Sequence, residues 1–235
     1  MSAIAIITAR GGSKRIPKKN IKEFCDKPII AYSIEAALKS GIFDEVMVST
    51  DSEEIAEIAE KYGAKVPFFR SSENAGDFAS TADVIAEVLE CYAREGKTFE
   101  YTCCIYPTAP FVTAKKLQDA LQKMIDEDAD SLMPVVSFSF PPQRGMVIRD
   151  GKLSYMFPEN AMKRSQDLET MYHDCGQFYF LKTDEFLKEK KLVLNKATAM
   201  EMSELEVQDI DNESDWNLAE LKYRLSVLKE KIWIR

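Results

Sequence analysis

Short apolar runs alternate with amphipathic segments along the first 137 residues. Continuous apolar runs, typical of buried parallel strands, occupy Ala3–Thr8 and the ranges 46–49, 65–69, 101–106 and 131–137. Between them, apolar residues recur at helical spacing over 28–39, 52–62, 81–94 and 113–127. Strands and helices that alternate in this way predict an α/β fold with a mainly parallel, Rossmann-like sheet.

This alternation stops after residue 137. The range 138–172 holds three prolines and two glycines around two short runs, 146–149 and 152–157, in which apolar and polar residues alternate. This pattern predicts a segment rich in hairpins that leaves the sheet. We expect the sheet to resume at 177–181 and a last helix at 213–231, within a single domain spanning 1–235. The apolar positions of that helix are Trp216, Leu218, Leu221, Leu225 and Leu228.

Composition and charge limit the classes of molecule that the protein can be expected to bind. The net charge of −8 disfavours bulk attraction to nucleic acid or to an acidic membrane surface, so an anionic ligand needs a local basic cluster. No apolar stretch reaches the roughly 18 residues of a membrane-spanning helix. The five cysteines lack zinc-ligand spacing and are odd in number, which favours reduced thiols and a cytoplasmic protein.

The loop after the first strand, residues 9–20, carries such a cluster. Gly11 and Gly12, followed by Ser13, let backbone N–H groups approach phosphate oxygens. The loop fits neither GxxxxGK[ST] nor GxGxxG, which disfavours a P-loop kinase and a dinucleotide dehydrogenase. We interpret it as a phosphate site, against the alternative of a solvated basic turn. Its positive charge comes from Arg10, Lys14, Arg15, Lys18 and Lys19.

Asp209 and Asp211 are two residues apart, so in an extended segment both carboxylates face the same way. Two carboxylates on one face suit Mg²⁺, which keeps waters and takes its other ligands from phosphates. The spacing alone leaves open the alternative that the pair caps the last helix.

Several segments, in this order along nearly the whole chain, resemble the motifs of the cytidylyltransferases that activate acidic sugars, such as the CMP-sialic acid and CMP-KDO synthetases. They are Arg10-Gly11-Gly12-Ser13-Lys14-Arg15-Ile16-Pro17-x-Lys19-Asn20, Val48-Ser49-Thr50-Asp51, Arg70 with Ala79-Ser80-Thr81, Pro107-Thr108-Ala109-Pro110 and Gln208-Asp209-Ile210-Asp211. The resemblance implies a nucleotide-diphospho-sugar transferase fold, CTP as co-substrate and Mg²⁺ as cofactor, held by Asp209 and Asp211.

The resemblance also assigns the nucleotide half of the site. Arg10, Lys14 and Lys19 would neutralise the triphosphate. The backbone of Gly11, Gly12 and Ser13 would cradle it, and Asn20 would hydrogen-bond the nucleotide. Arg70 and Ser80 would read cytosine, because a charged donor and a hydroxyl match the carbonyl and amine edge of that base.

The sugar half of the site follows from later segments. Arg164-Ser165-Gln166-Asp167 and Tyr172-His173-Asp174-x-Gly176-Gln177 resemble the branch of the family that activates pseudaminic acid. Tyr106 stands where the sialic acid enzymes have a sugar-contacting glutamine, and His173 where they tend to have an arginine; both favour a differently substituted nine-carbon acid. Arg164 is the candidate for the sugar carboxylate. The other candidate contacts are Thr108, Arg144, Gln166 and Gln177.

The resemblance further implies a homodimer in which the excursion 138–172 closes the partner's site, with Arg144 reaching across, and a role in flagellin or surface-polysaccharide modification. Three alternatives stay open. One is the same reaction on a sialic, legionaminic or KDO-type acid. The others are a non-catalytic nucleotide-sugar sensor, which need not keep Asp209 and Asp211, and a guanylyl- or uridylyltransferase, which the Lys19-Asn20 pair disfavours.

Overall fold

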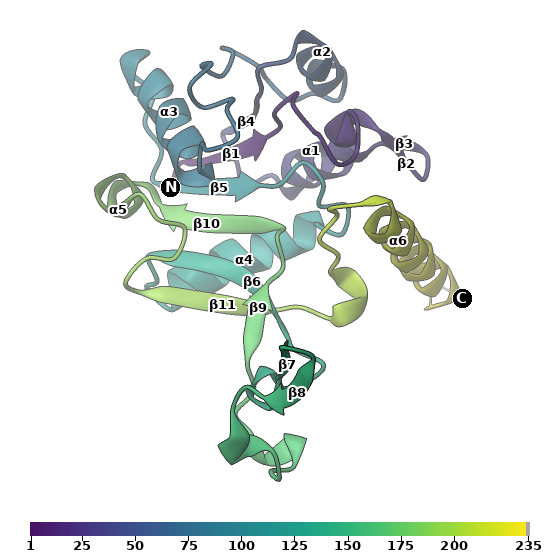
Figure 1. Cartoon of the computed structure of the whole chain (residues 1–235). Helices are drawn as coiled ribbons and strands as arrows, with labels where there is room; N and C mark the ends of the chain where they lie inside the picture. Colours follow the sequence, from purple (N-terminus) through teal and green to yellow (C-terminus); the bar gives the residue numbers. More distant parts are fainter. Residues whose placement is uncertain (234–235) are drawn as a thin grey trace.

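A mixed seven-stranded sheet organises the chain, and the computed structural model describes residues 1–233 (Figure 1). Five of its strands run in one direction, while β10 and β9 run in the other. The strands along the sheet are β11 (Ala197–Glu201), β6 (Ser131–Ser137), β10 (Phe178–Lys182), β5 (Tyr101–Ile105), β1 (Ala3–Thr8) and β4 (Glu45–Ser49), with β9 (Tyr172–Asp174) paired to β6. The α/β, mainly parallel prediction is confirmed.

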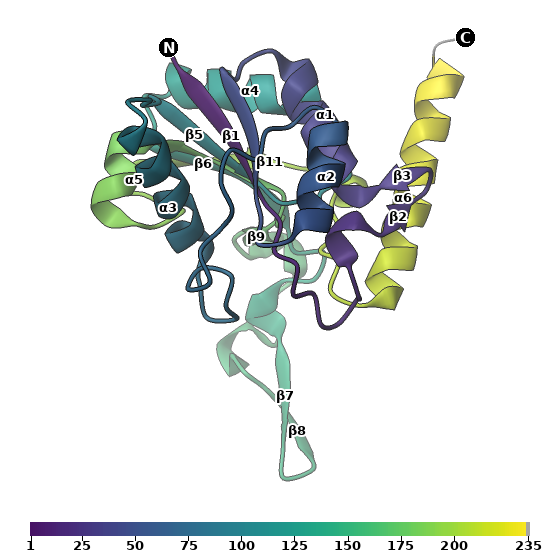
Figure 2. The same ribbon diagram turned by 90° about the horizontal axis from the view of Figure 1, so that it is seen from above.

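Helices cover both faces of this sheet (Figure 2). One apolar core includes Ile7, Ile34 and Leu117, and the other includes Ile6, Ile85 and Tyr92, because successive side chains of β1 point to opposite faces. The helices are α1 (Ile29–Ser40), α2 (Glu53–Lys61), α3 (Thr81–Arg94), α4 (Ala114–Asp126), α5 (Thr183–Glu189) and α6 (Glu213–Trp233).

The sequence prediction of a strand over 65–69 is wrong. Only Lys65 bridges to Met47 of β4, and the chain then leaves the sheet edge. Pro67 lacks the N–H that a continuing ladder would need. The prediction for 177–181 is confirmed as β10, but this strand is antiparallel to both of its neighbours. Strands β9 and β11 and helix α5 were not predicted.

The apolar positions of α6 divide between two faces. Trp216 is buried, against Phe24 of the small β2 (Glu23–Phe24) and β3 (Lys27–Pro28) hairpin, with ring centroids 5.5 Å apart. Leucines 218, 221, 225 and 228 are exposed. Among the side chains of α6 that the structure describes, up to residue 228, Trp216 and Tyr223 rather than the leucine series pack against the domain.

The predicted excursion 138–172 forms an arm that projects away from the sheet (Figures 1 and 2). Its centre is the hairpin of β7 (Met146–Arg149) and β8 (Lys152–Tyr155). Ile148 and Leu153 pair across this hairpin and expose 74% and 65% of their surface. Single-turn helices flank it at Pro142–Arg144, Pro158–Asn160 and Ser165–Asp167.

The five cysteines, all within the described residues, are free thiols, and Cys103, Cys104 and Cys175 are buried. None of the helices described in residues 1–233 combines the length and the apolar character needed to span a bilayer.

Candidate active site

A cleft of about 490 Å³ opens where β1, β4 and β5 end, at the carboxyl edge of the parallel half of the sheet. It brings together ten of the residues predicted from the sequence, which come from widely separated segments. They are Arg10, Ser13, Lys14, Lys19, Asn20, Arg70, Ser80, Tyr106, Thr108 and Asp211.

The basic loop after β1 is fixed by contacts of its own backbone. The Gly11 N–H donates to Asp51 Oδ1 at 2.7 Å, so this amide is engaged within the protein. A side chain at Gly11 would meet Ser52 Cβ at 3.1 Å, which explains the glycine. Asn20 is buried and its amide donates to the Arg10 carbonyl at 2.9 Å. Asn20 therefore holds the loop in shape, while Gly11 and Gly12 lie outside the cleft lining.

The predicted triphosphate ligands Arg10 and Lys14 both contact one acid, Asp77. Arg10 Nη1 lies 2.9 Å from Asp77 Oδ1, and Lys14 Nζ lies 2.5 Å from Asp77 Oδ2. Hydrogen bonds from Lys14 and Arg10 lower the pKa of Asp77 below its ordinary value. Two cations gathered around one carboxylate form an arrangement that suits a phosphate group equally well. Asp77 therefore occupies the position in which an anionic ligand would be neutralised.

Replacing Asp77 with serine is expected to tighten CTP binding about threefold, because the ligand then no longer competes with an internal carboxylate for exposed ion pairs. Isothermal titration calorimetry with CTP measures this. Glu73→Ser is the matched control, since Glu73 lies in the same loop but does not line the cleft. An affinity for CTP that stays the same or weakens in Asp77→Ser would contradict the competition.

Arg70 is buried, and its guanidinium donates to Ser49, through Nε to Oγ at 3.0 Å and Nη2 to the carbonyl at 2.6 Å. Burial lowers the pKa of Arg70, while the negative charges of Asp51 and Glu87 partly offset this shift. This rigid cation at the cleft wall fits a base-reading role.

Ser80, the other residue predicted to contact the base, is the N-cap of α3. Its Oγ accepts from the Asp83 N–H at 3.2 Å and donates to Asp83 Oδ2 at 2.6 Å. Its hydroxyl is thus engaged in a helix cap.

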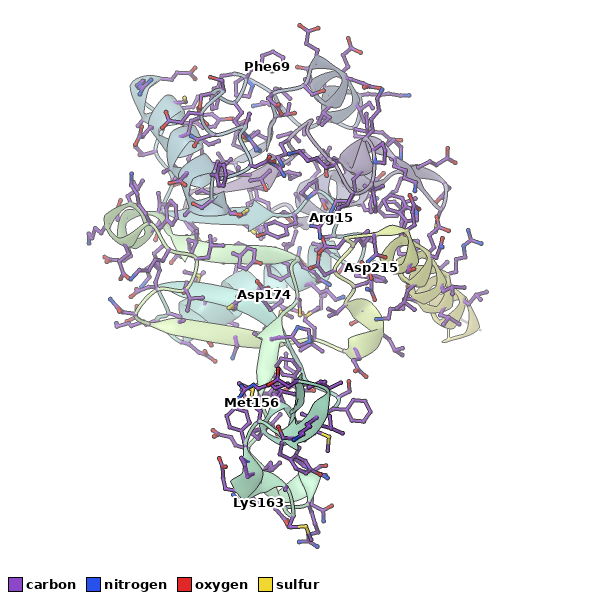
Figure 3. The ribbon with its side chains drawn as sticks, in the orientation of Figure 1. Arg15, Phe69, Met156, Lys163, Asp174 and Asp215 are labelled. Carbon is purple, nitrogen blue, oxygen red and sulfur yellow. The ribbon has the colours of Figure 1, made fainter. Side chains whose placement is uncertain are left out.

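The loop before α6 meets the basic loop. Lys19 Nζ donates to the Ile210 carbonyl at 2.6 Å, and Arg15 Nη2 lies 2.6 Å from Asp211 Oδ1. Burial lowers the pKa of Lys19, while the charges of Asp211 and Asp209 oppose that shift. Asp211 is held through its N–H, which donates to Asp215 Oδ2 at 3.0 Å. Figure 3 shows Arg15 and Asp215 near the start of α6.

The donor set of Asp209 and Asp211 fits a divalent cation. Partial burial raises the pKa of Asp209, and the negative charge of Asp211 adds to the rise. Such mutual repulsion is what a bound cation relieves. In residues 1–233 no cluster of three or more His, Cys, Asp or Glu side chains could hold a metal ion. A Mg²⁺ ion at this pair would therefore take its further ligands from water and phosphate oxygens.

At the other end of the cleft, Tyr106 follows β5, and its main chain is fixed by α1, where Ser33 Oγ donates to the Tyr106 carbonyl at 2.8 Å. Its hydroxyl lies 3.3 Å from Thr81 Oγ1. Burial raises the pKa of Tyr106. The tyrosine therefore presents a neutral hydroxyl in a largely closed environment, with Thr108 also lining the wall.

The remaining predicted sugar contacts lie outside this cleft. Arg144, Arg164 and Gln166 belong to the arm, where Figure 3 also shows Met156 and Lys163. Arg164 forms two hydrogen bonds with Asp167, at 2.8 and 2.9 Å. The single chain does not bring these three residues to the cleft, so their role as sugar ligands stays a prediction.

His173 and Gln177 flank the turn between β9 and β10. His173 is exposed and packs on Phe138, with ring centroids 4.8 Å apart. Gln177 is buried and donates to the Glu206 carbonyl at 2.6 Å. Neither residue lines the cleft, and within the described residues the buried Gln177 Oε1 has no hydrogen-bond partner.

Sequence reasoning missed Asn74, Gly76 and Asp77 as parts of the cleft, whereas the segment Ala79-Ser80-Thr81, quoted as one motif, does line it. A single acid in a polar loop carries no signal of its own, so Asp77 could not be found from the sequence. Thr81 was quoted in one motif with Ser80 but was given no role of its own, although a helix N-terminus is a common binding site for a phosphate group.

Residues 4–213 match the family model described as cytidylyltransferase. The chain belongs to the cytidylyltransferase family. A pseudaminic acid cytidylyltransferase of Campylobacter jejuni subsp. jejuni serotype O:2 is 41% identical to it over 227 residues, which cover 96% of this chain and 98% of the relative. A CMP-N,N'-diacetyllegionaminic acid synthase of Legionella pneumophila is 31% identical over 229 residues, covering 94% and 95%.

The fold of this cytidylyltransferase is also that of a solved CMP:2-keto-3-deoxy-manno-octonic acid synthetase complexed with CTP. The two structures agree with a TM-score of 0.68 over 96% of this chain and 99% of the other, at 16% sequence identity. At that identity the likeness concerns the fold alone, and it confirms the predicted nucleotide-diphospho-sugar transferase architecture.

Proposed function

We propose that this cytidylyltransferase transfers CMP from CTP to the anomeric hydroxyl of pseudaminic acid, a nine-carbon acidic sugar. The observation that carries the proposal is that Arg10, Lys14 and Lys19 line one cleft together with Asp211. In the reaction the sugar oxygen forms a bond to the α-phosphorus, the bond from that phosphorus to the bridging oxygen breaks, and pyrophosphate leaves. The hydroxyl proton passes to solvent.

The residues of the cleft act mainly through position and charge, as phosphoryl transfer requires. Arg10 and Lys14 release Asp77 and bind the triphosphate in its place. Lys19, held against Ile210, sits between the basic loop and the carboxylate pair, where it offsets charge that develops on the α-phosphate. Arg70 is fixed by Ser49 and offers a charged donor to the base without having to reorganise.

Asp209 and Asp211 are the residues that would hold Mg²⁺, which when bound supplies neutralisation of phosphate charge. The chain prepares this site in two ways. Asp215 fixes the backbone at Asp211, and Arg15 holds the Asp211 carboxylate by an exposed ion pair that a stronger ligand can replace.

The choice of sugar rests on Tyr106 and on the similarity to the Campylobacter relative. An alternative is the same reaction on legionaminic acid, which the similarity to the Legionella synthase favours. We further propose that the protein acts in the cytoplasm, where CTP is made, and that its product serves glycosylation of flagellin or of a surface polysaccharide.

The test is pyrophosphate release from CTP and Mg²⁺ with a panel of acidic sugars. We expect turnover with pseudaminic acid and much slower turnover with sialic and KDO-type acids. Turnover with sialic acid but not with pseudaminic acid would overturn the substrate assignment. Release with no acidic sugar at all would overturn the enzyme activity itself.

We also propose a homodimer in which the arm of each protomer closes the partner's cleft. The support is the exposed apolar surface of the arm, including Ile148 and Leu153, and the position of Arg144 and Arg164 outside their own cleft. Light scattering should report a dimer, and Ile148→Glu with Leu153→Lys should convert it to a monomer that retains its fold and loses turnover.

A complementation experiment tests whether Arg144 acts across the dimer. Lys19→Met damages the cleft, and Arg144→Ala damages the arm. If the two variants are co-expressed in equal amounts, a statistical mixture regains about a quarter of wild-type turnover, because each heterodimer has one intact composite site. No recovery would mean that Arg144 serves the cleft of its own protomer, and full turnover of Arg144→Ala alone would mean that it serves neither cleft.

A further inference from the structure

Arg15 lies between the two halves of the candidate active site. Its side chain lines the cleft together with the predicted triphosphate ligands Arg10 and Lys14. Its guanidinium, however, pairs with an acid of the predicted metal site, through Nη2 to Asp211 Oδ1 at 2.6 Å. Figure 3 shows Arg15 near the start of α6. One guanidinium thus belongs to the basic loop by its place in the chain and to the carboxylate pair by its contact.

The carboxylate pair is neutralised by cations of the chain itself. The negative charges of Asp209 and Asp211 both act on Lys19, where they oppose the fall in its pKa that burial causes. Arg15 contacts Asp211 directly. Two negative charges therefore face two positive charges. With a divalent cation at the pair, the carboxylate charge is already balanced, so the attraction that holds Arg15 is lost and repulsion takes its place.

The Arg15 guanidinium can change partners without a rearrangement of the backbone. The next residue, Ile16, is buried in an apolar core that includes Trp216, so the main chain beside Arg15 is anchored. The Arg15 side chain is 68% exposed, and exposed ion pairs contribute little stability because water and salt screen them. Asp211 keeps its place without the arginine, since its N–H donates to Asp215 Oδ2 at 3.0 Å.

A guanidinium released from a carboxylate binds well to phosphate oxygens, because its planar fork of N–H donors matches that group. We propose that Arg15 exchanges partners: it holds Asp211 until a divalent cation binds the carboxylate pair, and it then binds the triphosphate of CTP beside Arg10 and Lys14. The inference rests on the proposed function and deepens it, because it makes one cation of the phosphate site dependent on metal. Arg15 thereby couples metal binding to nucleotide binding, and by linkage the coupling is equal in both directions.

Two binding measurements on Arg15→Met should change in opposite directions, which a general loss of structure would not produce. Mn²⁺, titrated into the protein without nucleotide and followed by electron paramagnetic resonance, should bind about threefold more tightly, because the competing guanidinium is gone. CTP, titrated calorimetrically with Mg²⁺ present, should bind about tenfold more weakly, because a charge-assisted contact to phosphate is lost. In EDTA the affinity for CTP should change by less than about twofold.

Lys18→Met is the matched control, because it removes the same charge from the same loop while its partner, Glu54, lies outside the cleft lining. It should leave the affinities for Mn²⁺ and CTP within about twofold of wild type. Arg15→Lys keeps the charge, and it should restore the affinity for CTP in Mg²⁺ to within about threefold. Unchanged Mn²⁺ binding in Arg15→Met, or an equal loss of CTP affinity with Mg²⁺ and in EDTA, would overturn the exchange.

Asp211→Asn provides a test that needs no metal. A neutral amide holds the Arg15 guanidinium far more weakly than a carboxylate, so CTP should bind this variant about fivefold more tightly than the wild type in EDTA. Adding Arg15→Met should remove most of that gain, although the same substitution has little effect on the wild type under these conditions. A gain that persists without Arg15 would mean that only the lost repulsion between Asp211 and the triphosphate matters, and would overturn the exchange.

None of these titrations contains a sugar, so they separate the exchange from the proposed function. The expected shifts in binding, together with an absence of turnover with every acidic sugar, would count against the proposed function alone. Normal turnover with pseudaminic acid, together with Mn²⁺ and CTP affinities that do not depend on Arg15 in this way, would count against the exchange alone.

Discussion

Asp211→Asn is expected to lower kcat on the order of a hundredfold or more, because it removes one of two neighbouring carboxylates from the site where phosphate charge must be controlled. The substitution keeps the shape of the side chain. The contact that Asp211 contributes to the fold is its N–H to Asp215, which asparagine retains. The exposed ion pair with Arg15 adds little stability. The melting temperature should therefore stay the same while turnover is lost.

Calorimetry supplies a readout besides activity. In the wild type, Mg²⁺ should increase the affinity for CTP, and in Asp211→Asn this increase should disappear. Asp119→Asn serves as control, since Asp119 makes an exposed pair with Lys115 on α4. Normal turnover and a retained effect of Mg²⁺ in Asp211→Asn would remove this residue from the metal site.

Lys19→Met is expected to reduce kcat/KM for CTP about a hundredfold, because it deletes a preorganised charge between the basic loop and the carboxylate pair. Methionine keeps the apolar stem of the lysine but cannot donate to the Ile210 carbonyl. Some loss of stability should accompany the change, so the melting temperature must be measured with the kinetics.

The adjacent lysine offers the matched control. Lys18 lies in the same loop and pairs with Glu54 at 2.7 Å on the surface, outside the cleft lining. Lys18→Met should leave kcat/KM within about twofold of wild type, since exposed ion pairs contribute little. Equal effects of the two substitutions would indicate that only the net charge of the loop matters, and not the position of Lys19.

The sequence predicted the parts of the fold that depend on local patterns. The apolar run Ala3–Thr8 and the amphipathic segment of α3 appear where expected, because buried strands and helix faces impose their own periodicity. The antiparallel direction of β10 was not predictable in this way. A buried apolar strand looks the same in either direction, and its neighbours β5 and β6 are distant in the chain.

The residues of the candidate site likewise fall into those with a local sequence signal and those that depend on contacts between distant segments. Arg10, Lys14 and Lys19 could be found because cations beside adjacent glycines are a local signal. The roles of Asn20 and Ser80 were harder to predict, since an amide that bonds a backbone carbonyl and a hydroxyl that caps a helix look identical in sequence to ligand contacts. Asp174 could be quoted from a motif, but its hydrogen bond with the Tyr179 hydroxyl depends on three-dimensional contacts.

The bond between Lys19 and Ile210 joins residues 191 positions apart, and the ion pair of Lys22 with Glu213 spans the same separation. Contacts between such distant segments form late in folding, because the intervening chain must first be ordered. During synthesis, the basic loop leaves the ribosome long before its partner segment exists. The nascent chain can therefore form the β1–β4 half of its sheet while it is still unable to complete the catalytic cleft, so activity begins only after nearly all of the domain has been made.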